Sequence, residues 1–448
     1  MNEKLEKFKT AMRGKTAALV GFGVSNRAAA RFLISVGMAV TAYDAKATDE
    51  AKSAAREIGA ELFEREKFEK IDADLILRTP GVRPDAISVT RGELTSEMEL
   101  FCSLCPCPIY AVSGSDGKTT TTTIISKMLG EEFAGTGRRV WLGGNIGTPL
   151  LPEIENIKSD DVCVLELSSF QLMTMDFSPR VAVVTNVSPN HLNWHTSMSE
   201  YVAAKRRIFV GQAAGCRLVT NAENEITRNF AAEARCEARL FSSKNSADGE
   251  IRDKAIYIGG RRIIALSDIV IPGVHNAENM MAAMLAVNEV VSDENMYKVA
   301  STFRGVPHRA ELVLERGGVK FYNSSIDTSP TRTIAALSSF KEKVIIIIGG
   351  YDKHIPPEPL IVPLCEKTKK IFCTGGTGRA VYDMMTGAGY GGEICYDPDF
   401  DEAVARAARS AGSGDVVLLS PAAASFDRFR NFEERGERFK QILKDINI

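Results

Sequence analysis

The stretch Gly114-Ser115-Asp116-Gly117-Lys118-Thr119-Thr120 carries the residue types in this sequence that are best suited to chemistry. It follows an apolar run that ends at Val112 and precedes a predicted helix, so its glycines lie where a strand turns into a helix. Backbone N–H groups can cradle phosphate there, Lys118 can reach the β- and γ-phosphates, and the Thr119 hydroxyl can bind Mg²⁺. The spacing is shorter than that of the common phosphate loop. Taken alone, the stretch is more often an ordinary strand-to-helix turn.

Other reactive side chains follow predicted strands. Glu166 ends an apolar strand at 161–167, and a buried carboxylate is costly unless it is paired or binds a metal, so Glu166 is a candidate Mg²⁺ ligand. His191 follows a strand at 181–185, at the edge where open α/β sheets bind ligands. A loop histidine by itself is more often a bystander.

The N-terminal segment has a nucleotide-binding pattern. Gly21-x-Gly23 follows a strand, and Asp44 ends the next strand about 20 positions later, as in a Rossmann unit. Asn26 stands where a dinucleotide site has its third glycine. This departure favours a nucleotide diphosphate held by backbone amides at 23–25. The turn 78–81 follows another strand and is able to face a ligand. An ordinary turn that binds no ligand explains each of these turns equally well.

Strands and helices alternate along the whole chain, which predicts an α/β protein. With 448 residues the chain is too long for one core. We expect three α/β domains: a Rossmann-like domain at 1–99, a central P-loop ATPase-like domain at 100–309 and a second Rossmann-like domain at 310–448. Residues 82–100 are predicted as a polar connection and a helix. The helix at 199–210 carries Lys205, which is expected to lie on a solvated basic face.

Composition excludes several classes of function. The 55 Lys and Arg residues nearly balance the 57 Asp and Glu residues, which disfavours nucleic acid as a partner. The apolar runs have strand length, and the charged N-terminus lacks the apolar core of a signal peptide. We therefore expect a cytoplasmic protein without membrane segments.

The nine cysteines are scattered, which predicts reduced thiols. Cys102, Cys105 and Cys107 form a cluster that a metal site would explain. No second pair of Cys or His lies nearby at ligand spacing, and Pro106 and Pro108 stiffen the segment. Free thiols are therefore favoured over zinc.

Together the motifs resemble those of the Mur ligase family, the ATP-dependent amide ligases of peptidoglycan precursor synthesis. The resemblance covers all three predicted domains, and within the family the C-terminal run is similar to that of the D-glutamate-adding branch. The motifs that carry it are Gly114 to Thr120, Gly144-Asn145-Ile146-Gly147, Glu166-Leu167-Ser168-Ser169-Phe170-Gln171, Asn190-His191-Leu192, Ala204-Lys205, His275-Asn276-x-x-Asn279, Pro307-His308-Arg309 and 420–436.

The resemblance implies ligation of D-glutamate to UDP-N-acetylmuramoyl-L-alanine through an acyl phosphate. It also implies two Mg²⁺ ions, carbamylation of Lys205 and a monomeric protein. Implied catalytic residues are Lys118, Glu166, His191 and Lys205, and implied metal ligands are Thr119, Glu166, His191 and carbamylated Lys205. Implied ATP-binding residues are Gly114, Ser115, Asp116, Gly117, Lys118, Thr119, Thr120, Asn276 and Arg309. Implied UDP-sugar-binding residues are Val24, Ser25, Asp44, Thr79, Asn145 and Ser168, and implied D-glutamate-binding residues are Thr328, Lys353, Ser425 and Phe432.

The sequence departs from the family pattern in the third domain. Many relatives have an aspartate and a lysine where this chain has Ser324 and Ile326. Asp327 can replace the acid, but Ile326 cannot replace a cation. Asn190 and Asn193 stand where aspartates are usual.

Three other interpretations compete with this one. A folylpolyglutamate synthetase or a Mur-like amidotransferase partner would share the fold, but the C-terminal run at 420–436 disfavours both. A non-catalytic nucleotide-binding regulator would explain Ile326 but not the joint presence of Lys118, Glu166, His191 and Lys205. A Rossmann oxidoreductase is disfavoured by Asn26 and by the later phosphate cradle.

Overall fold

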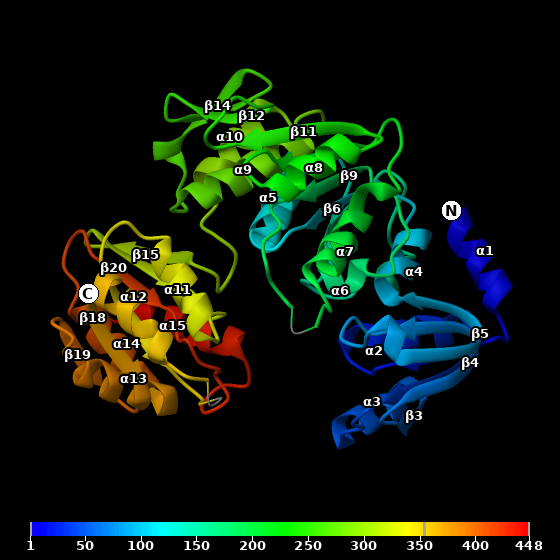
Figure 1. Cartoon of the computed structure of the whole chain (residues 1–448), viewed down its shortest axis with the longest axis horizontal. Helices are drawn as coiled ribbons and strands as arrows, with labels where there is room; N and C mark the ends of the chain where they lie inside the picture. Colours follow the sequence, from blue (N-terminus) through cyan, green and yellow to red (C-terminus); the bar gives the residue numbers. More distant parts are fainter. Residues whose placement is uncertain (1, 193, 353–354, 447–448) are drawn as a thin grey trace. The chain divides into compact units, whose positions relative to one another are not determined.

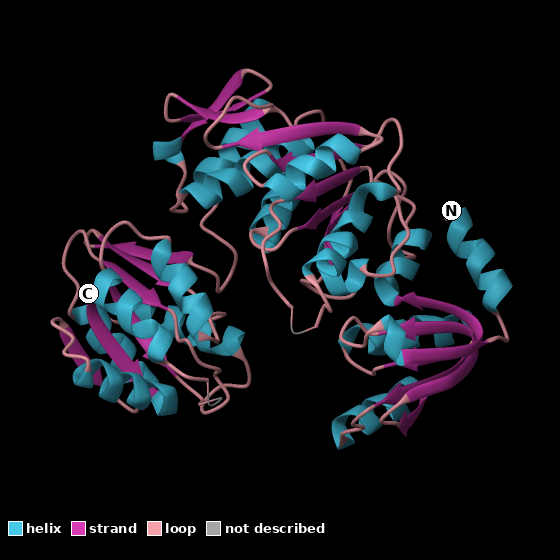
Figure 2. Cartoon of the chain, viewed as in Figure 1, coloured by secondary structure: helices cyan, strands magenta, loops and turns pink. Residues whose placement is uncertain are grey.

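Three sheets, each flanked by helices, make up the chain (Figures 1 and 2). The computed structural model describes residues 2–192, 194–352 and 355–446. Contacts divide the chain into two units: Met1–Asp268 with Ala277–Ser301, and Ile269–Asn276 with Thr302–Ile448. The first unit contains two of the sheets and the second unit contains the third.

The first sheet is parallel throughout, with the order β3-β2-β1-β4-β5. Parallel strands are joined by crossover connections, which are usually helical. The strands are β1 (Thr16–Val20), β2 (Ala39–Asp44), β3 (Glu61–Glu64), β4 (Phe68–Arg78) and β5 (Ile87–Ser96). The helices are α1 (Glu3–Met12), α2 (Val24–Val36), α3 (Asp49–Ile58) and α4 (Glu97–Leu104). Here α2 and α3 lie between strands, α4 follows the last strand and α1 precedes the first, whereas β4 and β5 are joined by residues 79–86 without an α-helix.

The second sheet has the order β14-β13-β12-β11-β10-β9-β6-β8-β7, and only the pairs of β13 are antiparallel. Its strands are β6 (Ile109–Ser113), β7 (Val140–Gly144), β8 (Val162–Glu166), β9 (Val181–Val184), β10 (Arg217–Asn221), β11 (Glu237–Ser242), β12 (Gly249–Arg252), β13 (Ala255–Ile258) and β14 (Arg261–Ala265). The helices that follow these strands are α5 (Lys118–Glu132), α6 (Ser169–Leu172), α7 (Met198–Val210), α8 (Glu225–Glu233), α9 (Val274–Val287) and α10 (Asp293–Thr302).

The third sheet has the order β15-β16-β20-β17-β18-β19, with one antiparallel pair, β15 and β16. Its strands are β15 (Glu311–Arg316), β16 (Val319–Asn323), β17 (Val344–Gly349), β18 (Thr368–Thr374), β19 (Glu393–Tyr396) and β20 (Val416–Leu419). Its helices are α11 (Pro330–Ser338), α12 (Ile361–Lys367), α13 (Gly375–Gly387), α14 (Phe400–Arg409) and α15 (Phe432–Asp445).

Strand β17 shows why the third sheet is covered on both faces. Ile346 and Ile348 pack into one apolar core, and Ile345 and Ile347 pack into another. All four are fully buried, and burying an isoleucine side chain contributes about 2 kcal/mol. A continuous apolar run of this kind is typical of a strand between two helical layers.

The predicted α/β fold class is confirmed, but one element was predicted wrongly. Residues 87–96 form the edge strand β5 instead of a polar connection. Its middle residues are exposed, so the apolar alternation that marks a half-buried strand is weak there. Within the described ranges, no helix has both the length and the apolar character to cross a membrane.

Candidate active site

The segment between β6 and α5 forms a tight loop at the carboxyl edge of the second sheet. Gly114 and Gly117 have φ angles of 151° and 77°. A Cβ atom at Gly114 would lie 1.9 Å from Thr185 Oγ1, and one at Gly117 would lie 2.2 Å from Asn279 Oδ1. Both positions therefore require glycine, and the loop brings its backbone directly to the start of α5.

The loop is held by residues that follow β9. Ser115 N donates to Asn186 O (2.9 Å), and Asp116 N donates to Asn186 Oδ1 (3.0 Å). Thr185 Oγ1 donates to Asp116 O (2.5 Å), and the Ser115 hydroxyl lies 2.9 Å from the Tyr201 hydroxyl. These bonds fix the loop conformation before any ligand binds.

Two lysines converge on one carbonyl oxygen of this loop. Lys118 Nζ donates to Gly114 O (3.0 Å) and to Ser115 O (2.8 Å), and Lys205 Nζ donates to Gly114 O (2.6 Å). Lys205 is only 1% exposed, and its Nζ lies 4.6 Å from the ring centroid of Tyr201. Burial first, and then the charge of Lys118, lower the pKa of Lys205 well below its ordinary value. The expectation that Lys205 lies on a solvated face is wrong.

Glu166 ends β8 beside the loop-bearing strand β6. Its Oε1 accepts a hydrogen bond from Asn145 Nδ2 (2.8 Å). Its Oε2 is buried and has no hydrogen-bond partner among the described residues. An unsatisfied buried carboxylate oxygen is costly, and a hard cation such as Mg²⁺ would satisfy it. Glu166 and the half-buried Thr119 therefore fit the oxygen-ligand chemistry of Mg²⁺.

His191 lies in an exposed loop of aromatic residues. Its φ angle is 55°, and its ring centroid lies 4.9 Å from that of Phe170. The neighbouring His195 is buried, with Nε2 2.9 Å from Ser169 Oγ and Nδ1 3.3 Å from Glu200 Oε2. Burial lowers the pKa of His195 despite the opposing carboxylate. Of the two histidines, His191 is the accessible one.

The N-terminal turn explains the departure at Asn26. This side chain is fully buried, and its Nδ2 donates to the carbonyl oxygens of Val20 (3.2 Å), Gly21 (2.7 Å) and Leu77 (3.2 Å). Asn26 therefore joins β1, its turn and β4. It shapes the turn instead of leaving room for a dinucleotide.

The predicted UDP-sugar residues lie around two turns of the first unit. Val24 and Ser25 begin α2, and Val24 is 72% exposed. Asp44 Oδ2 accepts a hydrogen bond from Phe22 N (2.7 Å), and Thr79 N donates to Val20 O (2.8 Å). Ser168 follows strand β8 of the second sheet, where it is the N-cap of α6 and forms a capping box with Gln171.

The predicted nucleotide residues of the second unit are Asn276 and Arg309. Asn276 lies near the start of α9, where its Nδ2 donates to Pro272 O (2.6 Å). Arg309 follows the buried His308, whose backbone oxygen accepts a hydrogen bond from Ile326 N (3.1 Å). The chain segments of Arg309 and Ile326 therefore meet.

Asp327 carries a buried carboxyl group next to Ser324 and Ile326, the two positions at which this sequence departs from the family pattern. Its Oδ2 accepts a hydrogen bond from the Ser420 hydroxyl (2.8 Å), and it is 6% exposed. Burial raises the pKa of Asp327 to about 6, against the opposing effect of hydrogen bonds from Ser324 and Ser420. Asp327 thus carries a buried carboxyl group at this turn, and its replacement of the relatives' aspartate stays a prediction.

The described D-glutamate candidates lie on two turns and at the start of α15, and Arg435 of this helix contacts both turns. Arg435 is 1% exposed and donates from Nε to Ser325 Oγ (3.0 Å) and from Nη1 to Ala424 O (2.9 Å). Ser325 Oγ donates to Phe432 O (2.8 Å). The segments that carry Thr328, Ser425 and Phe432 are therefore tied together. Lys353 lies outside the described residues.

Sequence reasoning missed the residues that support these groups. Tyr201 precedes Lys205 by one helical turn, so an i, i+4 search from the lysine would have found it. Asn186 and Arg435 gave no such local signal, because their partners lie 70 and 110 positions away in the chain.

Two protein-family models match this chain. Residues 112–287 match the Mur ligase middle domain, and residues 308–423 match the Mur ligase, glutamate ligase domain. The chain is 48% identical to UDP-N-acetylmuramoylalanine–D-glutamate ligase of Acetivibrio thermocellus and 44% identical to the ligase of the same name of Clostridium perfringens. Each match covers 100% of both chains.

Solved structures show the same fold at low identity. UDP-N-acetylmuramate-alanine ligase MurC of Thermotoga maritima is 18% identical, with a TM-score of 0.58 over 96% of this chain and 99% of that chain. FolC of E. coli, in complex with DHPP and ADP, is 14% identical, with a TM-score of 0.54 over 77% and 92%.

The chain belongs to the Mur ligase family, as its motifs predicted. Within this family, the relatives to which it is similar over its full length are UDP-N-acetylmuramoylalanine–D-glutamate ligases.

Proposed function

We propose that this protein is an ATP-dependent ligase that joins D-glutamate to UDP-N-acetylmuramoyl-L-alanine, as a cytoplasmic monomer in peptidoglycan precursor synthesis. The observation that carries the proposal is the convergence of Lys118 and Lys205 on Gly114 O, with the unsatisfied Glu166 oxygen on the neighbouring strand. The arrangement offers cationic and backbone donors for phosphate beside a ligand for a cation. The full-length relatives supply the identity of the substrates.

The chemistry has two steps. The γ-phosphoryl group of ATP passes to a carboxylate oxygen of UDP-N-acetylmuramoyl-L-alanine, which gives an acyl phosphate and releases ADP. The amine of D-glutamate then attacks the acyl carbon, and phosphate leaves. Such transfers depend mainly on positioning and on neutralising charge. Lys118 and the amides of residues 114–120 serve this purpose, assisted by Asn276 and Arg309.

Mg²⁺ supplies further charge neutralisation when it is bound. Thr119, Glu166, His191 and carbamylated Lys205 would hold two such ions. The low pKa of Lys205 supports carbamylation, because a neutral amine is the form that adds CO₂. Carbamylation also turns a buried cation into an anionic ligand.

The domains 1–99, 100–309 and 310–448 take different parts in this proposal. The turns at Val24, Ser25, Asp44 and Thr79, with Asn145 and Ser168, hold the UDP-sugar. Thr328 and Lys353 hold the α-carboxylate of D-glutamate, and Ser425 and Phe432 position its side-chain carboxylate. Cation-to-carboxylate contacts of this kind are strong.

Phosphate release tests the proposal directly. The protein is incubated with ATP, Mg²⁺ and UDP-N-acetylmuramoyl-L-alanine, and with D-glutamate, L-glutamate, a diamino acid or no amino acid. We expect sustained release with D-glutamate alone. Release with another amino acid would identify a different ligase of this fold, and no release under any condition would favour a non-catalytic nucleotide-binding protein.

Bicarbonate tests the role of Lys205. Activity should fall in CO₂-depleted buffer and recover when bicarbonate is added. A ¹³C carbamate signal should appear with labelled bicarbonate in the wild type and be absent in Lys205→Arg. Indifference of both readouts to bicarbonate would contradict carbamylation.

A further inference from the structure

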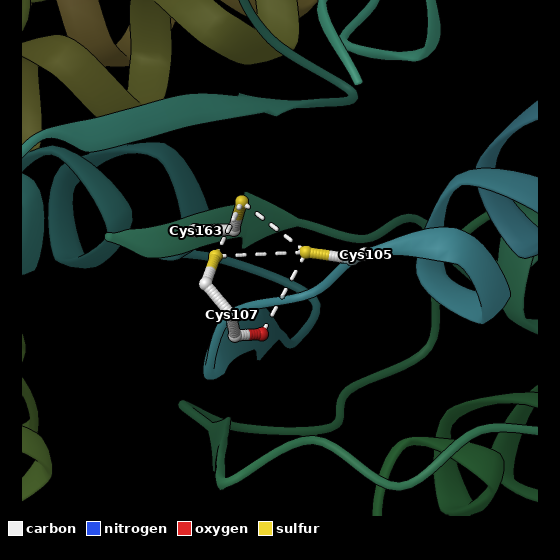
Figure 3. A group of neighbouring side chains, drawn as sticks. All are labelled: Cys105, Cys107 and Cys163. Carbon is white, nitrogen blue, oxygen red and sulfur yellow. Dashed lines mark hydrogen bonds between the residues drawn. The ribbon is translucent and has the colours of Figure 1, made fainter. Parts of the chain in front are cut away.

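Three cysteine side chains meet at one end of the strands of the second sheet. The loop 114–117 between β6 and α5, here called the phosphate loop, lies at the other end. Figure 3 shows Cys105, Cys107 and Cys163 with their sulfur atoms facing one another. The Sγ atom of Cys105 lies 3.6 Å from the Sγ atom of Cys107 and 3.6 Å from that of Cys163. The Sγ atoms of Cys107 and Cys163 are 3.5 Å apart. The sequence alone showed only the first pair, because Cys163 lies on β8, more than 50 positions later.

We propose that Cys105, Cys107 and Cys163 form a binding site for a thiophilic divalent cation of the Zn²⁺ class. Zinc binds thiolate sulfur at about 2.3 Å. A point about 2.3 Å from all three sulfurs lies about 1 Å outside their plane, with sulfur–metal–sulfur angles of about 100°. This is close to three corners of a tetrahedron, and the fourth position is left for an exchangeable ligand.

The positions of the three thiols are set by the backbone segments that carry them. Cys105 caps the end of α4, and Cys107 follows within a Cys-Pro-Cys-Pro segment whose prolines fix the backbone. Cys163 pairs with Ile109, the first residue of β6. All three belong to one apolar core and are less than 8% exposed. Little ordering is therefore required when a cation binds.

The local charge favours a divalent cation over a monovalent one. Three thiolates with a divalent ion carry one net negative charge, and Lys4 Nζ lies 3.4 Å from the backbone oxygen of Cys105. A monovalent ion would leave two negative charges in a buried place, which is costlier. The cation binds thiolates, so binding displaces the protons that the thiols still carry, and affinity should rise with pH.

This site is separate from the proposed active site. The phosphate loop begins after Ser113, at the other end of β6, about 13 Å away at the usual rise per strand residue. A cation here would cross-link the end of α4, the entry to β6 and strand β8. We expect it to stabilise the connection between the first two sheets without taking part in ligation.

Cobalt titration of the reduced, tag-free full chain tests the proposal. Co²⁺ bound to thiolates gives an intense sulfur-to-metal charge-transfer absorption, whereas Co²⁺ at an oxygen-ligand Mg²⁺ site does not. We expect this absorption to saturate at one Co²⁺ per chain and to disappear when Zn²⁺ is added. Its absence in wild-type protein with all nine thiols reduced would overturn the proposal, even if the ligase is fully active.

Variants assign the ligands. Cys107→Ser should weaken Co²⁺ and Zn²⁺ binding by at least tenfold and abolish the rise in melting temperature that Zn²⁺ gives the wild type. Cys102→Ser is the matched control, since Cys102 is buried on α4 but outside the triad. It should keep both effects. Equal loss in the two variants would overturn the assignment, and the wild-type cobalt spectrum decides the matter if Cys107→Ser does not fold.

Discussion

Lys118 and Lys205 contact the same carbonyl oxygen but differ in how deeply their amino groups are buried. Both donate to Gly114 O, but Lys205 is buried, whereas Lys118 is half-buried at the start of α5. Two like charges at one oxygen are unfavourable, and the more buried group loses its proton more easily. In the proposed reaction, Lys118 is therefore the lysine that follows the transferring phosphoryl group, whereas burial lowers the pKa of Lys205.

Removing the Lys118 ammonium should abolish turnover. Lys118→Ala removes a charge that stabilises the transition state, and we expect kcat to fall on the order of 10²-fold or more. Lys127→Ala is the control, because Lys127 lies exposed on the same helix. Phosphate release under saturating substrates measures both. A Lys118→Ala variant within a few fold of the control would contradict the phosphate assignment.

Asp327 should make stability depend on pH. Burial raises its pKa from 3.8 to about 6, so the folded protein holds this proton more tightly than the unfolded chain. The Asp327 carboxyl contributes fully to the free energy of unfolding at pH values below 3.8, the pKa of this group in the unfolded chain. This contribution is lost as the pH rises through about 6, its pKa in the folded protein. Between about pH 4.5 and about pH 7.5 the loss is on the order of 2 kcal/mol.

The Asp327→Asn variant isolates this effect, because an amide does not titrate in this range. We expect urea unfolding at about pH 4.5 and about pH 7.5 to show that the free energy of unfolding of the wild type, relative to that of the variant, is about 2 kcal/mol larger at the lower pH. Asp383→Asn, at an exposed helix position, controls for the loss of one charge. A difference between wild type and Asp327→Asn that does not change with pH would contradict the assignment.

At the level of elements, the phosphate loop depends on where its glycines lie. Gly117→Ala places a methyl group against Asn279 and forces a left-handed backbone on alanine, which costs about 1–2 kcal/mol before the clash is counted. We expect kcat/KM for ATP to fall at least tenfold. Gly130→Ala, in the same helix, meets no atom within 4 Å and should be neutral or slightly stabilising. Similar losses in the two variants would show that the loop conformation is not the cause.

Elements with a strong local pattern were predictable from sequence. The apolar run of β17 and the strand–glycine–helix order around Gly114 are set by residues close together in the chain. Strand β5 was missed because its exposed edge lacks alternation. The roles of Asn26 and Arg435 and the approach of Cys163 to Cys107 depend on contacts made only when distant segments pack. No local pattern could indicate them.

At the scale of the whole molecule, the candidate residues for the two substrates of ligation are divided between the units. The turn at Thr79 belongs to the first unit, and the turn at Thr328 belongs to the second. Each turn is held by bonds within its own unit: Thr79 N donates to Val20 O (2.8 Å), and Thr328 N donates to Ile326 O (2.9 Å). Local changes in one turn should therefore leave the other intact.

Two matched substitutions test whether the residues that bind the two substrates are divided between the two units. Thr79→Val and Thr328→Val each remove one hydroxyl and keep the branched shape of the side chain. Thr79→Val should raise KM for UDP-N-acetylmuramoyl-L-alanine and leave KM for D-glutamate unchanged, and Thr328→Val should do the reverse. A lost hydrogen bond to a charged group costs about 1.5–3 kcal/mol, so each affected KM should rise about tenfold or more. If either variant raised both KM values together, the substrates would not be divided between the units as proposed.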